Sequence, residues 1–406
     1  MFNLYTLYID PGTGSILFSV IAGAAASLYF LLRAFIQKIK FILSGGRVSA
    51  KNKVSCKYVI YNEGKQYWNV FKDIVEQFEI NKIELCYLTS AHDDPIFNCN
   101  YSYIKPEYIG EGNKAFAYLN ILSADVVLMT TPGLDVFQLK RSKSVKHYSH
   151  ILHSPSDATI YRLFGIDYFD SVLLNGDYQA FDIRILEKQR GLHSKQLVTV
   201  GCPYLDSFFN KSRQITEEEN NQFTVLVSPS WGASSLLTLY GEDLLDPLAE
   251  SGWRIIIRPH PQSKKSEAAV LKRLQDKYFN NYNIIWDFES DNIYSLKKSN
   301  IMISDFSGII FDFMFLFDRP VIYSNKEIDP RPYDFCDLDH EIWRNKTIRD
   351  TCIELNKEDF SKITDVIKNA SKSETLALAR KNAKETAWQY QGEAGIRAFE
   401  FLKNIS

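Results

Sequence analysis

Short, strongly apolar runs alternate with longer amphipathic stretches from about Lys57 to the end of the chain. The runs are rich in Val, Ile and Tyr, which favours buried strands, and the stretches between them repeat apolar residues at helical spacing. In the first half, strands are predicted at 57–62, 82–90, 124–130, 147–154, 170–176 and 196–201. In the second half, strands are predicted at 223–230, 253–261, 282–288, 300–305 and 319–324, with helices at 242–250, 264–277 and 307–317. This alternation is typical of a parallel α/β fold.

A polar and charged stretch, residues 208–222, separates the two series of strands and shows no apolar period. It predicts an interdomain linker. We expect Rossmann-like domains at 51–210 and 222–356, followed at 357–406 by helices that pack across both. Two doubly wound sheets that face each other place a ligand cleft at the carboxyl ends of their strands.

Residues 1–50 have the pattern of a membrane anchor with a basic flank. Ile16–Leu32 is an uncharged apolar run, just short of the roughly 20 residues of a spanning helix. Arg33, Lys38 and Lys40 follow it, so the positive-inside rule predicts that the main body lies on the cytoplasmic side of the cell membrane. The alternative is a helix that lies flat on the membrane or packs on the protein.

The amino-acid composition indicates a globular protein and argues against some classes of function. A chain of 406 residues with 45% hydrophobic and 24% charged residues is globular and long enough for two domains. Its formal net charge of -2 argues against a nucleic-acid binder, so any anion site must be local. The six cysteines are dispersed without metal-ligand spacing and are expected to be free thiols in a reducing compartment.

The segment RPHP ends one of the predicted strands with two potential phosphate donors. Arg258 and His260 can both donate to phosphate oxygens, and the prolines beside His260 stiffen the backbone that presents them. Lys264 and Lys265 follow at a helix start, where cations oppose the helix dipole unless an anion is near. The alternative is that Arg258 and His260 simply hydrogen-bond to a neighbouring loop.

The segment SDFSG, residues 304–308, joins another strand to an apolar helix. Free N–H groups at a helix start attract phosphate, and Ser307 and Gly308 offer a hydroxyl and an unobstructed backbone N–H. Asp305 is expected to cap the helix or bind a ribose hydroxyl, because a carboxylate repels phosphate. Ser304 and, from the VSPSW segment, Ser230 complete the same rim if the sheet is parallel.

Two further residues are candidates. Asp312 lies between Phe311 and Phe313, and a carboxylate in such surroundings must find a partner or lose its charge. It is either part of the site or a buried structural hydrogen-bond acceptor. His153 ends a strand of the first half and should face the cleft, where a histidine can take a proton from an attacking hydroxyl.

Taken in this order, the motifs resemble the CDP-glycerol glycerophosphotransferase family of teichoic-acid primases and polymerases. The family's His-Pro motif looks like His260-Pro261, and its Ser-Asp-x-Ser-Ser and Phe-Asp-Phe signatures look like residues 304–308 and 311–313. Its Gly-x-Pro-Arg-x-Asp turn resembles residues 201–206. The resemblance runs roughly from His153 to the C-terminal helices.

The chain departs from the family pattern at three points. Tyr204 stands where the family has Arg, and Gly308 stands where it has its second Ser. The polymerases carry Trp-His-Gly around their acceptor-side histidine, whereas this chain has Leu-His-Ser around His153. These changes concern the acceptor and the exact donor more than the diphosphate end of the site.

The resemblance implies two facing Rossmann-like domains of the GT-B type, the first for the acceptor and the second for the nucleotide donor. The expected enzyme is membrane-attached and moves a phosphoalcohol, glycerol phosphate first among them, from a CDP-activated donor to a hydroxyl of a lipid-linked glycan or polymer, releasing CMP. His153 and His260 would be catalytic. The donor would be bound by Arg258, Ser230, Ser304, Asp305, Ser307, Gly308 and Asp312.

Two alternatives stay open on sequence alone. One is a GT-B glycosyltransferase that uses a nucleotide sugar for cell-surface polysaccharide synthesis, and the other is an inactive membrane-attached scaffold. No cofactor is expected, and Mg²⁺ is not indicated because the chain shows no carboxylate cluster of the DxD kind. Glycerol, ribitol or another alcohol would all be compatible with the expected CDP-linked donor.

Overall fold

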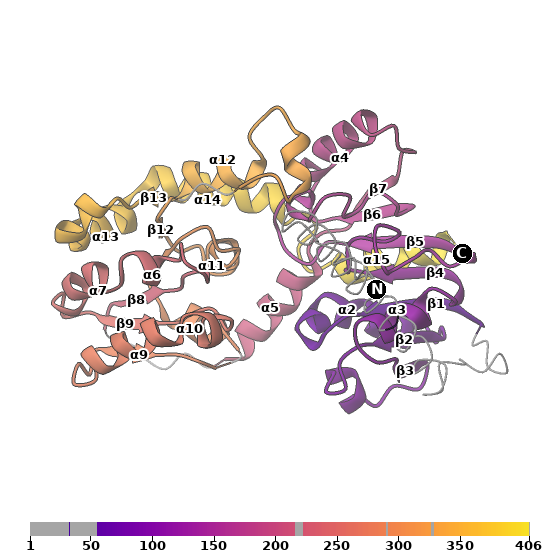
Figure 1. The fold of residues 1–406 in the computed structure, drawn as a ribbon, viewed down its shortest axis with the longest axis horizontal. Helices are drawn as coiled ribbons and strands as arrows, with labels where there is room; N and C mark the ends of the chain where they lie inside the picture. The colour runs from indigo at the N-terminus through magenta and orange to yellow at the C-terminus, as the bar shows by residue number, and fades with distance from the viewer. Residues whose placement is uncertain (1–31, 33–54, 216–221, 290, 326–328, 406) are drawn as a thin grey trace, which may run out of the picture. The chain divides into compact units, whose positions relative to one another are not determined.

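The computed structural model describes Leu32 and residues 55–215, 222–289, 291–325 and 329–405. Over these residues, the first sheet has seven parallel strands in the order β3-β2-β1-β4-β5-β6-β7. Its strands are β1 (Ser55–Asn62), β2 (Leu85–Thr89), β3 (Ile104–Tyr108), β4 (Ser123–Met129), β5 (Ser144–Ile151), β6 (Ser171–Leu174) and β7 (Gln196–Thr199). The helices between them include α2 (Trp68–Ile80), α3 (Asn113–Leu119) and α4 (Tyr178–Gln189) (Figure 1).

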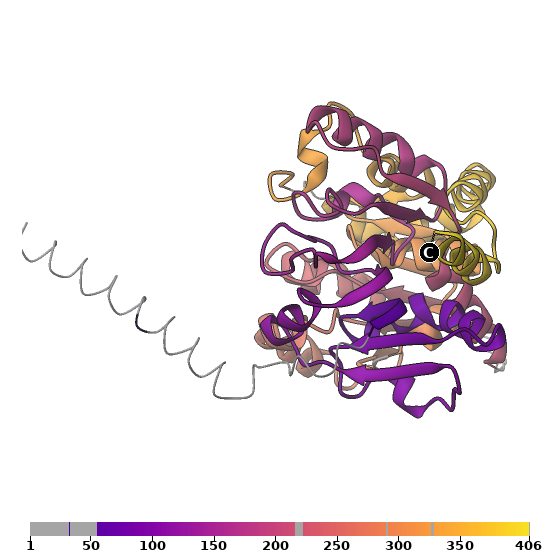
Figure 2. The ribbon, with the colours of Figure 1, turned by 90° about the vertical axis from the view of Figure 1, so that its right-hand side faces the viewer.

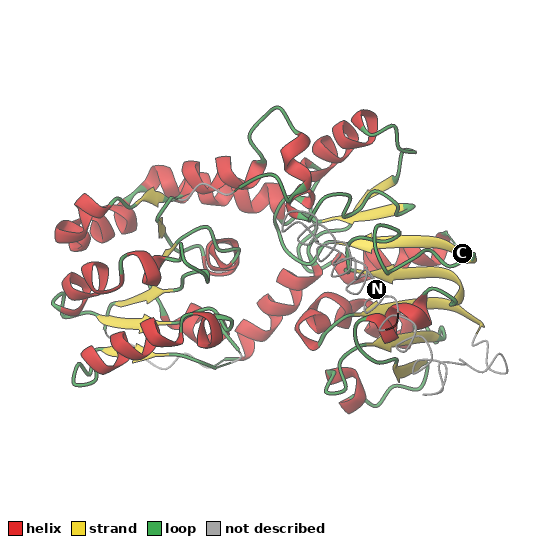
Figure 3. Cartoon of the chain, in the orientation of Figure 1, coloured by secondary structure: helices red, strands yellow, loops and turns green. Residues whose placement is uncertain are grey.

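Within the same described ranges, the second sheet has six parallel strands in the order β10-β9-β8-β11-β12-β13. Its strands are β8 (Thr224–Val227), β9 (Arg254–Ile257), β10 (Ile284–Trp286), β11 (Ile301–Ser304), β12 (Val321–Tyr323) and β13 (Ile353–Glu354). Its helices are α6 (Leu236–Leu239), α7 (Gly241–Ala249), α8 (Ser263–Ser266), α9 (Ala268–Lys277), α10 (Ile293–Lys298), α11 (Ile309–Phe317) and α12 (Trp343–Thr351). Figure 3 shows helices flanking the strands of both sheets.

Both sheets reverse their strand order once, and these positions matter for function. The order changes direction between β1 and β4 in the first sheet and between β8 and β11 in the second. In open parallel sheets, ligands bind outside the carboxyl ends of the strands at such switch points. The fold therefore directs attention to the loops that follow β1, β4, β8 and β11.

The central strands of both sheets are buried on both faces, which explains their uninterrupted apolar sequences. Along β1, Tyr58 and Ile60 join one core cluster with α2, whereas Val59 and Tyr61 join the cluster on the opposite face. The strands of the second sheet likewise divide their side chains between two clusters. Both domains thus have two packed layers on a central sheet, as the period-two alternation of strands requires.

Helix α5 (Pro203–Gln214) follows the last strand of the first sheet and leads toward the second (Figure 1). Gly201, just before it, has φ of +96°, and an added Cβ would lie 2.5 Å from the carbonyl oxygen of Gln389. Any larger residue would be strained there and would collide with the backbone. This explains the glycine of the Gly-x-Pro turn.

The last three helices are α13 (Ile363–Lys372), α14 (Glu374–Ala387) and α15 (Ala394–Asn404). Asp206 of α5 accepts hydrogen bonds from the Trp388 Nε1 at 2.7 Å and from the backbone N–H of Gly392 and Ala394 at 2.8 and 3.1 Å. This buried carboxylate ties the turn between α14 and α15 to α5. In the view of Figure 2, α15 lies beside the first sheet, where Phe399 packs edge-on against Phe78 of α2.

The structure confirms the parallel α/β fold, and strands form within all the predicted apolar runs. Two strands at sheet edges, β3 and β13, were not predicted from the sequence. The prediction of a linker at 208–222 is wrong for its first half, because Phe208 to Gln214 continue α5 and Phe208 is buried. The helix predicted at 264–277 is divided into α8 and α9.

Two predictions concern the ends and the cysteines. Except for Leu32, the predicted anchor at residues 1–50 lies outside the described residues. Over the part of the chain that the structure describes, none of the helices has the length and apolarity needed to cross a bilayer. The expectation of six free thiols is wrong for Cys56 and Cys86, which form a disulfide between neighbouring strands, whereas Cys99, Cys202, Cys336 and Cys352 are free.

Candidate active site

The loops after β8 and β11 meet at the switch point of the second sheet. Ser304 ends β11 and donates its hydroxyl to the carbonyl of Ser228 at 2.6 Å. Asp305 accepts from both the backbone N–H and the hydroxyl of Ser230, at 2.9 Å each, and from the Leu236 N–H at 3.1 Å. Burial raises the pKa of Asp305 above its usual range. Asp305 and Ser230 are therefore bonded to each other, Ser304 is bonded to the Ser228 carbonyl, and all three build the loop framework.

The start of α11 is the open part of this rim. Gly308 precedes the helix, no side chain caps it, and Gly308 is exposed. A Cβ added at Gly308 would meet no atom within 4 Å, so this position has room for the small serine side chain of the family pattern. The N–H groups of Ile310 and Phe311 donate back to the carbonyls of Ser307 and Gly308. The dipole of the nine-residue helix and the absence of a side-chain cap still make its start suited to an anion. Ser307 lies beside it, as the sequence predicted.

His260 stands on the neighbouring strand end and is neutral at pH 7. Burial is the main reason that its pKa is lowered, and Glu267 and Asp305 oppose this effect only in part. The Gln262 N–H donates to its Nδ1 at 3.1 Å, so the proton of the neutral ring must be on Nε2. Its ring lies 6.3 Å from that of the half-exposed Trp231. His260 thus offers an N–H donor to a ligand rather than a positive charge.

The guanidinium of Arg258 is not available to bind a phosphate, because it is already bonded to other groups of the protein. Its side chain is 9% exposed and forms an ion pair with Asp287, and its Nη2 donates to the carbonyl of Glu289 at 2.7 Å. Asp287 also accepts from the Ser295 hydroxyl. The guanidinium therefore holds the loop after β10 against the RPHP turn, which is the loop-packing alternative considered for the sequence.

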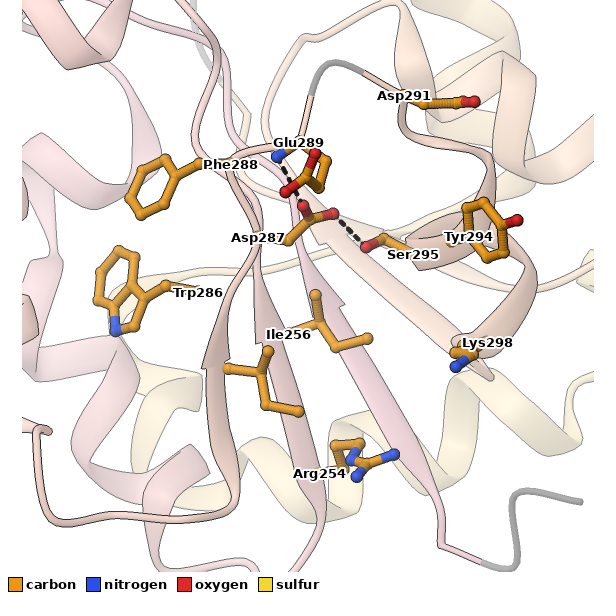
Figure 4. A pocket seen from close by; sticks show the side chains of 11 residues that line it. Arg254, Ile256, Trp286, Asp287, Phe288, Glu289, Asp291, Tyr294, Ser295 and Lys298 are labelled. Atoms are coloured by element: carbon orange, nitrogen blue, oxygen red, sulfur yellow. Dashed lines mark hydrogen bonds between the residues drawn. The ribbon is translucent and has the colours of Figure 1, made fainter. Parts of the chain in front are cut away.

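A pocket of about 540 Å³ opens beside this loop, against β9, β10 and α10 (Figure 4). Its walls include Ile256 at the centre, with Arg254 and Lys298 at one end and Asp287 and Glu289 at the other. The carboxylates line the end that adjoins the RPHP turn. Because two anions in contact repel, this pocket is a poorer place for a diphosphate than the start of α11.

Asp312 is buried within α11 and has one partner from another helix. The Tyr204 hydroxyl of α5 donates to its Oδ2 at 2.9 Å. Burial raises the pKa of Asp312 to about 7, and the hydrogen bond from Tyr204 opposes that rise. Tyr204, the residue that replaces the family's Arg, thus contacts the aspartate of the Phe-Asp-Phe signature. Here Asp312 joins α11 to α5 and does not line the open start of the helix.

His153 follows β5, the neighbour of β4, and therefore lies one strand away from the switch point of the first sheet. Its Nδ1 lies 3.2 Å from the Thr130 hydroxyl, just after β4, and 3.1 Å from the Tyr161 hydroxyl. Burial lowers its pKa to about 4, so the ring is neutral at pH 7. If Nδ1 donates to one of these hydroxyls, Nε2 is left unprotonated and can accept a proton. In the described part of the chain, the hydrogen bonds and ring contacts of His153 are with Thr130, Tyr161 and Tyr67 of the first domain.

One residue of interest, Arg344 near the start of α12, was not predicted from the sequence. The loop after β5 reaches this helix, where Asp157 accepts from the backbone N–H of Trp343 and Arg344 at 3.0 and 2.8 Å. The Arg344 side chain is buried, and its Nε has no hydrogen-bond partner among the described residues. No motif marks it, because only the fold brings α12 to the loop after β5.

The structure offers no metal site in the part of the chain that it describes. Across those residues, His, Cys, Asp and Glu side chains form no group of three or more that could hold a metal ion.

Residues 172–337 match the family model described as CDP-glycerol:poly(glycerophosphate) glycerophosphotransferase. The chain is a glycerophosphotransferase-like enzyme. The match confirms the resemblance drawn from the motifs and spans His260, residues 304–308 and Asp312. His153 lies before the matched residues of this glycerophosphotransferase-like enzyme and Arg344 after them.

Solved structures share the fold of the enzyme. A structure of the wall teichoic acid polymerase TagF is 13% identical, covers 92% of this chain and 97% of its own, and has a TM-score of 0.57. UDP-GlcNAc 2-epimerase from Methanocaldococcus jannaschii (14% identity, coverage 86% and 99%, TM-score 0.55) and a putative UDP-N-acetylglucosamine 2-epimerase from Listeria monocytogenes (14%, 86% and 96%, 0.58) are also similar. At these identities the likeness shows only the fold, a GT-B-like pair of parallel α/β domains. None of the curated protein sequences matches the chain.

Proposed function

We propose that the enzyme transfers a phosphoalcohol, glycerol phosphate first among them, from a CDP-activated donor to a hydroxyl of a lipid-linked glycan or teichoic-acid-like polymer. The observation that carries this proposal is the open, uncapped start of α11 at the switch point of the second sheet. It lies inside the residues that match the glycerophosphotransferase family. A helix start of this kind favours the diphosphate of a nucleotide donor.

The donor-side roles follow from the state of each group. Ser307 would donate its hydroxyl and Gly308 its backbone N–H to the diphosphate. His260 would donate from Nε2 to a phosphate oxygen, because its Nδ1 is already occupied by the Gln262 N–H. Donors held in place before reaction stabilise the charge that moves onto the departing CMP.

The transfer itself needs one bond made and one broken. The acceptor oxygen attacks the β-phosphorus of the CDP-linked donor, and the bond from that phosphorus to the bridging oxygen breaks. CMP leaves with the electrons of that bond, and the phosphoalcohol becomes esterified to the acceptor. His153 Nε2 would take the acceptor's hydroxyl proton and release it to water, a role that requires the neutral ring that burial maintains.

Membrane attachment belongs to the same proposal. The apolar run Ile16–Leu32 and the cations after it support a chain held at the cell membrane with its α/β domains on the cytoplasmic side. A lipid-linked acceptor would then be presented at the surface to which the enzyme is attached.

Nucleotide release from a panel of donors tests the proposal. The purified full chain is incubated with a glycerol phosphate oligomer and with CDP-glycerol, CDP-ribitol or a UDP-sugar in separate reactions. We expect CMP from a CDP-alcohol and no UDP from the sugar nucleotide. UDP release would instead identify a glycosyltransferase, and no turnover of any donor, with binding retained, would indicate a scaffold.

A further inference from the structure

Arg344 is a buried cation that has no ion-pair partner among the described residues. The residue is 8% exposed, and within the same part of the chain its Nε has no hydrogen-bond partner. A buried charge is costly unless it is paired, because the interior does not replace the water that it has lost. Burial accordingly lowers the pKa of Arg344 below its usual range.

Two carboxylates lie near Arg344, but both are already bonded elsewhere. Asp157 and Asp305 interact electrostatically with the guanidinium. The two side-chain oxygens of Asp157 accept hydrogen bonds from two backbone N–H groups at the start of α12. The side-chain oxygens of Asp305 accept hydrogen bonds from the backbone N–H and hydroxyl of Ser230 and from the backbone N–H of Leu236. They offset the charge of Arg344 from a distance and leave its donors free for another anion.

The position of Arg344 connects the two halves of the candidate site. Trp343, the preceding residue, stacks on Phe311 in the first turn of α11 with ring centroids 5.5 Å apart and planes 26° apart. Asp157, which holds the start of α12, follows His153 by four positions in the chain. Arg344 therefore lies where the loop after β5 meets the beginning of α11.

We propose that Arg344 binds the donor's diphosphate and, with the start of α11, forms one anion site. This inference rests on the proposed function. The cationic role was expected of Arg258, whose guanidinium is committed to Asp287, and Arg344 takes that role. A planar guanidinium can donate to two phosphate oxygens at once, which a lysine cannot do. Asp157 acts as a positioning residue, because it fixes the helix start that carries Arg344.

Ligand binding to Arg344→Gln and Arg344→Lys tests the assignment. Calorimetry with the full chain is carried out with CDP, CMP, cytidine and glycerol 3-phosphate, and the Tm is recorded with and without CDP. For Arg344→Gln we expect the Kd for CDP to rise at least about tenfold, with cytidine binding unchanged. The Tm without ligand should stay equal or rise, because an unpaired buried charge has been removed.

Arg380→Gln is the matched control. Arg380 is also buried, at 5% exposure, but its Nε lies 3.6 Å from Asp318 on the far end of α11. Its loss should lower the Tm and leave the affinity for CDP unchanged. A structural role for Arg344 would give the same result as this control, so the pair separates packing from ligand binding.

Each remaining outcome decides a different point. Wild-type affinity of Arg344→Gln for CDP would overturn the inference and leave the proposed function standing. If Arg344→Gln lost affinity only for glycerol 3-phosphate, Arg344 would bind a phosphate of the acceptor, and its assignment to the donor would be overturned. If the wild type bound inorganic pyrophosphate through Arg344 but not CDP, the anion site would stand and the proposed function would fail. If Arg344→Gln did not fold, the affinity of Arg344→Lys for CDP would decide between the two roles. Lysine cannot donate to two phosphate oxygens as a guanidinium does, so wild-type affinity in this variant would contradict the proposed contact.

Discussion

The substitution Asp312→Asn should make the folded chain more stable at high pH and leave its stability unchanged at low pH. In an unfolded chain this carboxyl has the ordinary aspartate pKa of 3.8, whereas burial raises the pKa to about 7 in the folded protein. Between these values the folded state keeps a proton that the unfolded state has lost. Stability therefore falls as the pH rises through this window, and the penalty is complete above the folded pKa.

The magnitude follows from the size of the pKa shift. A rise of about three units corresponds to about 4 kcal/mol at 1.36 kcal/mol per unit. For a chain of this length the unfolding entropy is roughly 0.85 kcal/mol per kelvin, so the expected difference in Tm is about 5 °C. Asparagine keeps an acceptor for the Tyr204 hydroxyl and has no charge to lose, so it avoids this penalty.

Thermal unfolding of the wild type and Asp312→Asn between about pH 3 and about pH 8.5 measures the effect. The Tm difference should be near zero at about pH 3, reach about 40% of its full value at about pH 5 and approach the full value above about pH 7.5. In a Tyr204→Phe background the rise should begin at the same pH but continue to higher pH, because the hydrogen bond from Tyr204 lowers the pKa of Asp312 in the folded protein. A Tm difference that does not change with pH would refute the argument that Asp312 is buried and protonated.

Three further predictions concern the candidate site. His260→Ala should lower kcat at least about 100-fold at unchanged Tm, since it removes an N–H donor to the phosphates, and exposed His193→Ala in the same assay should retain wild-type activity. Arg258→Gln should cost about 3 kcal/mol of stability in chemical denaturation, because it leaves Asp287 without its ion pair; a loss below about 1 kcal/mol would contradict this structural role. Tyr161→Phe should lower kcat while leaving the KM for the donor unchanged, because it removes one of the two hydroxyls that orient His153 through Nδ1; a change in KM alone would place Tyr161 on the donor side.

The sequence predicted the fold well because parallel strands are buried on both faces and read as continuous apolar runs. It failed where that signal is absent. β3 carries Pro106 and is mostly exposed, and β13 has two residues, so neither shows a strand pattern. The predicted linker includes the C-terminal half of α5, which is mostly polar. Its buried Phe208 alone was too little to show the apolar repeat of a helix.

The position of the candidate site could be predicted from the sequence. Which of its side chains are free to bind a ligand, and which are already paired, could not. Strand ends in a parallel sheet converge, so residues 304–308 and His260 could be placed on one rim from their order alone. Whether a guanidinium is free depends on contacts across the fold. Arg258 has Asp287 from the neighbouring strand as its partner, whereas Arg344 has no ion pair within the described chain, and no local pattern distinguishes the two.

The central claim is that the bond broken lies between the two phosphates of a CDP-linked donor. The direct measurement uses CDP-glycerol labelled in its β-phosphate, the full chain and a glycerol phosphate oligomer, with the nucleotide and polymer products separated. The account predicts that the label appears in the polymer and that the nucleotide released is unlabelled CMP. Labelled CDP as the released nucleotide, or no transfer of label to the polymer, would contradict it.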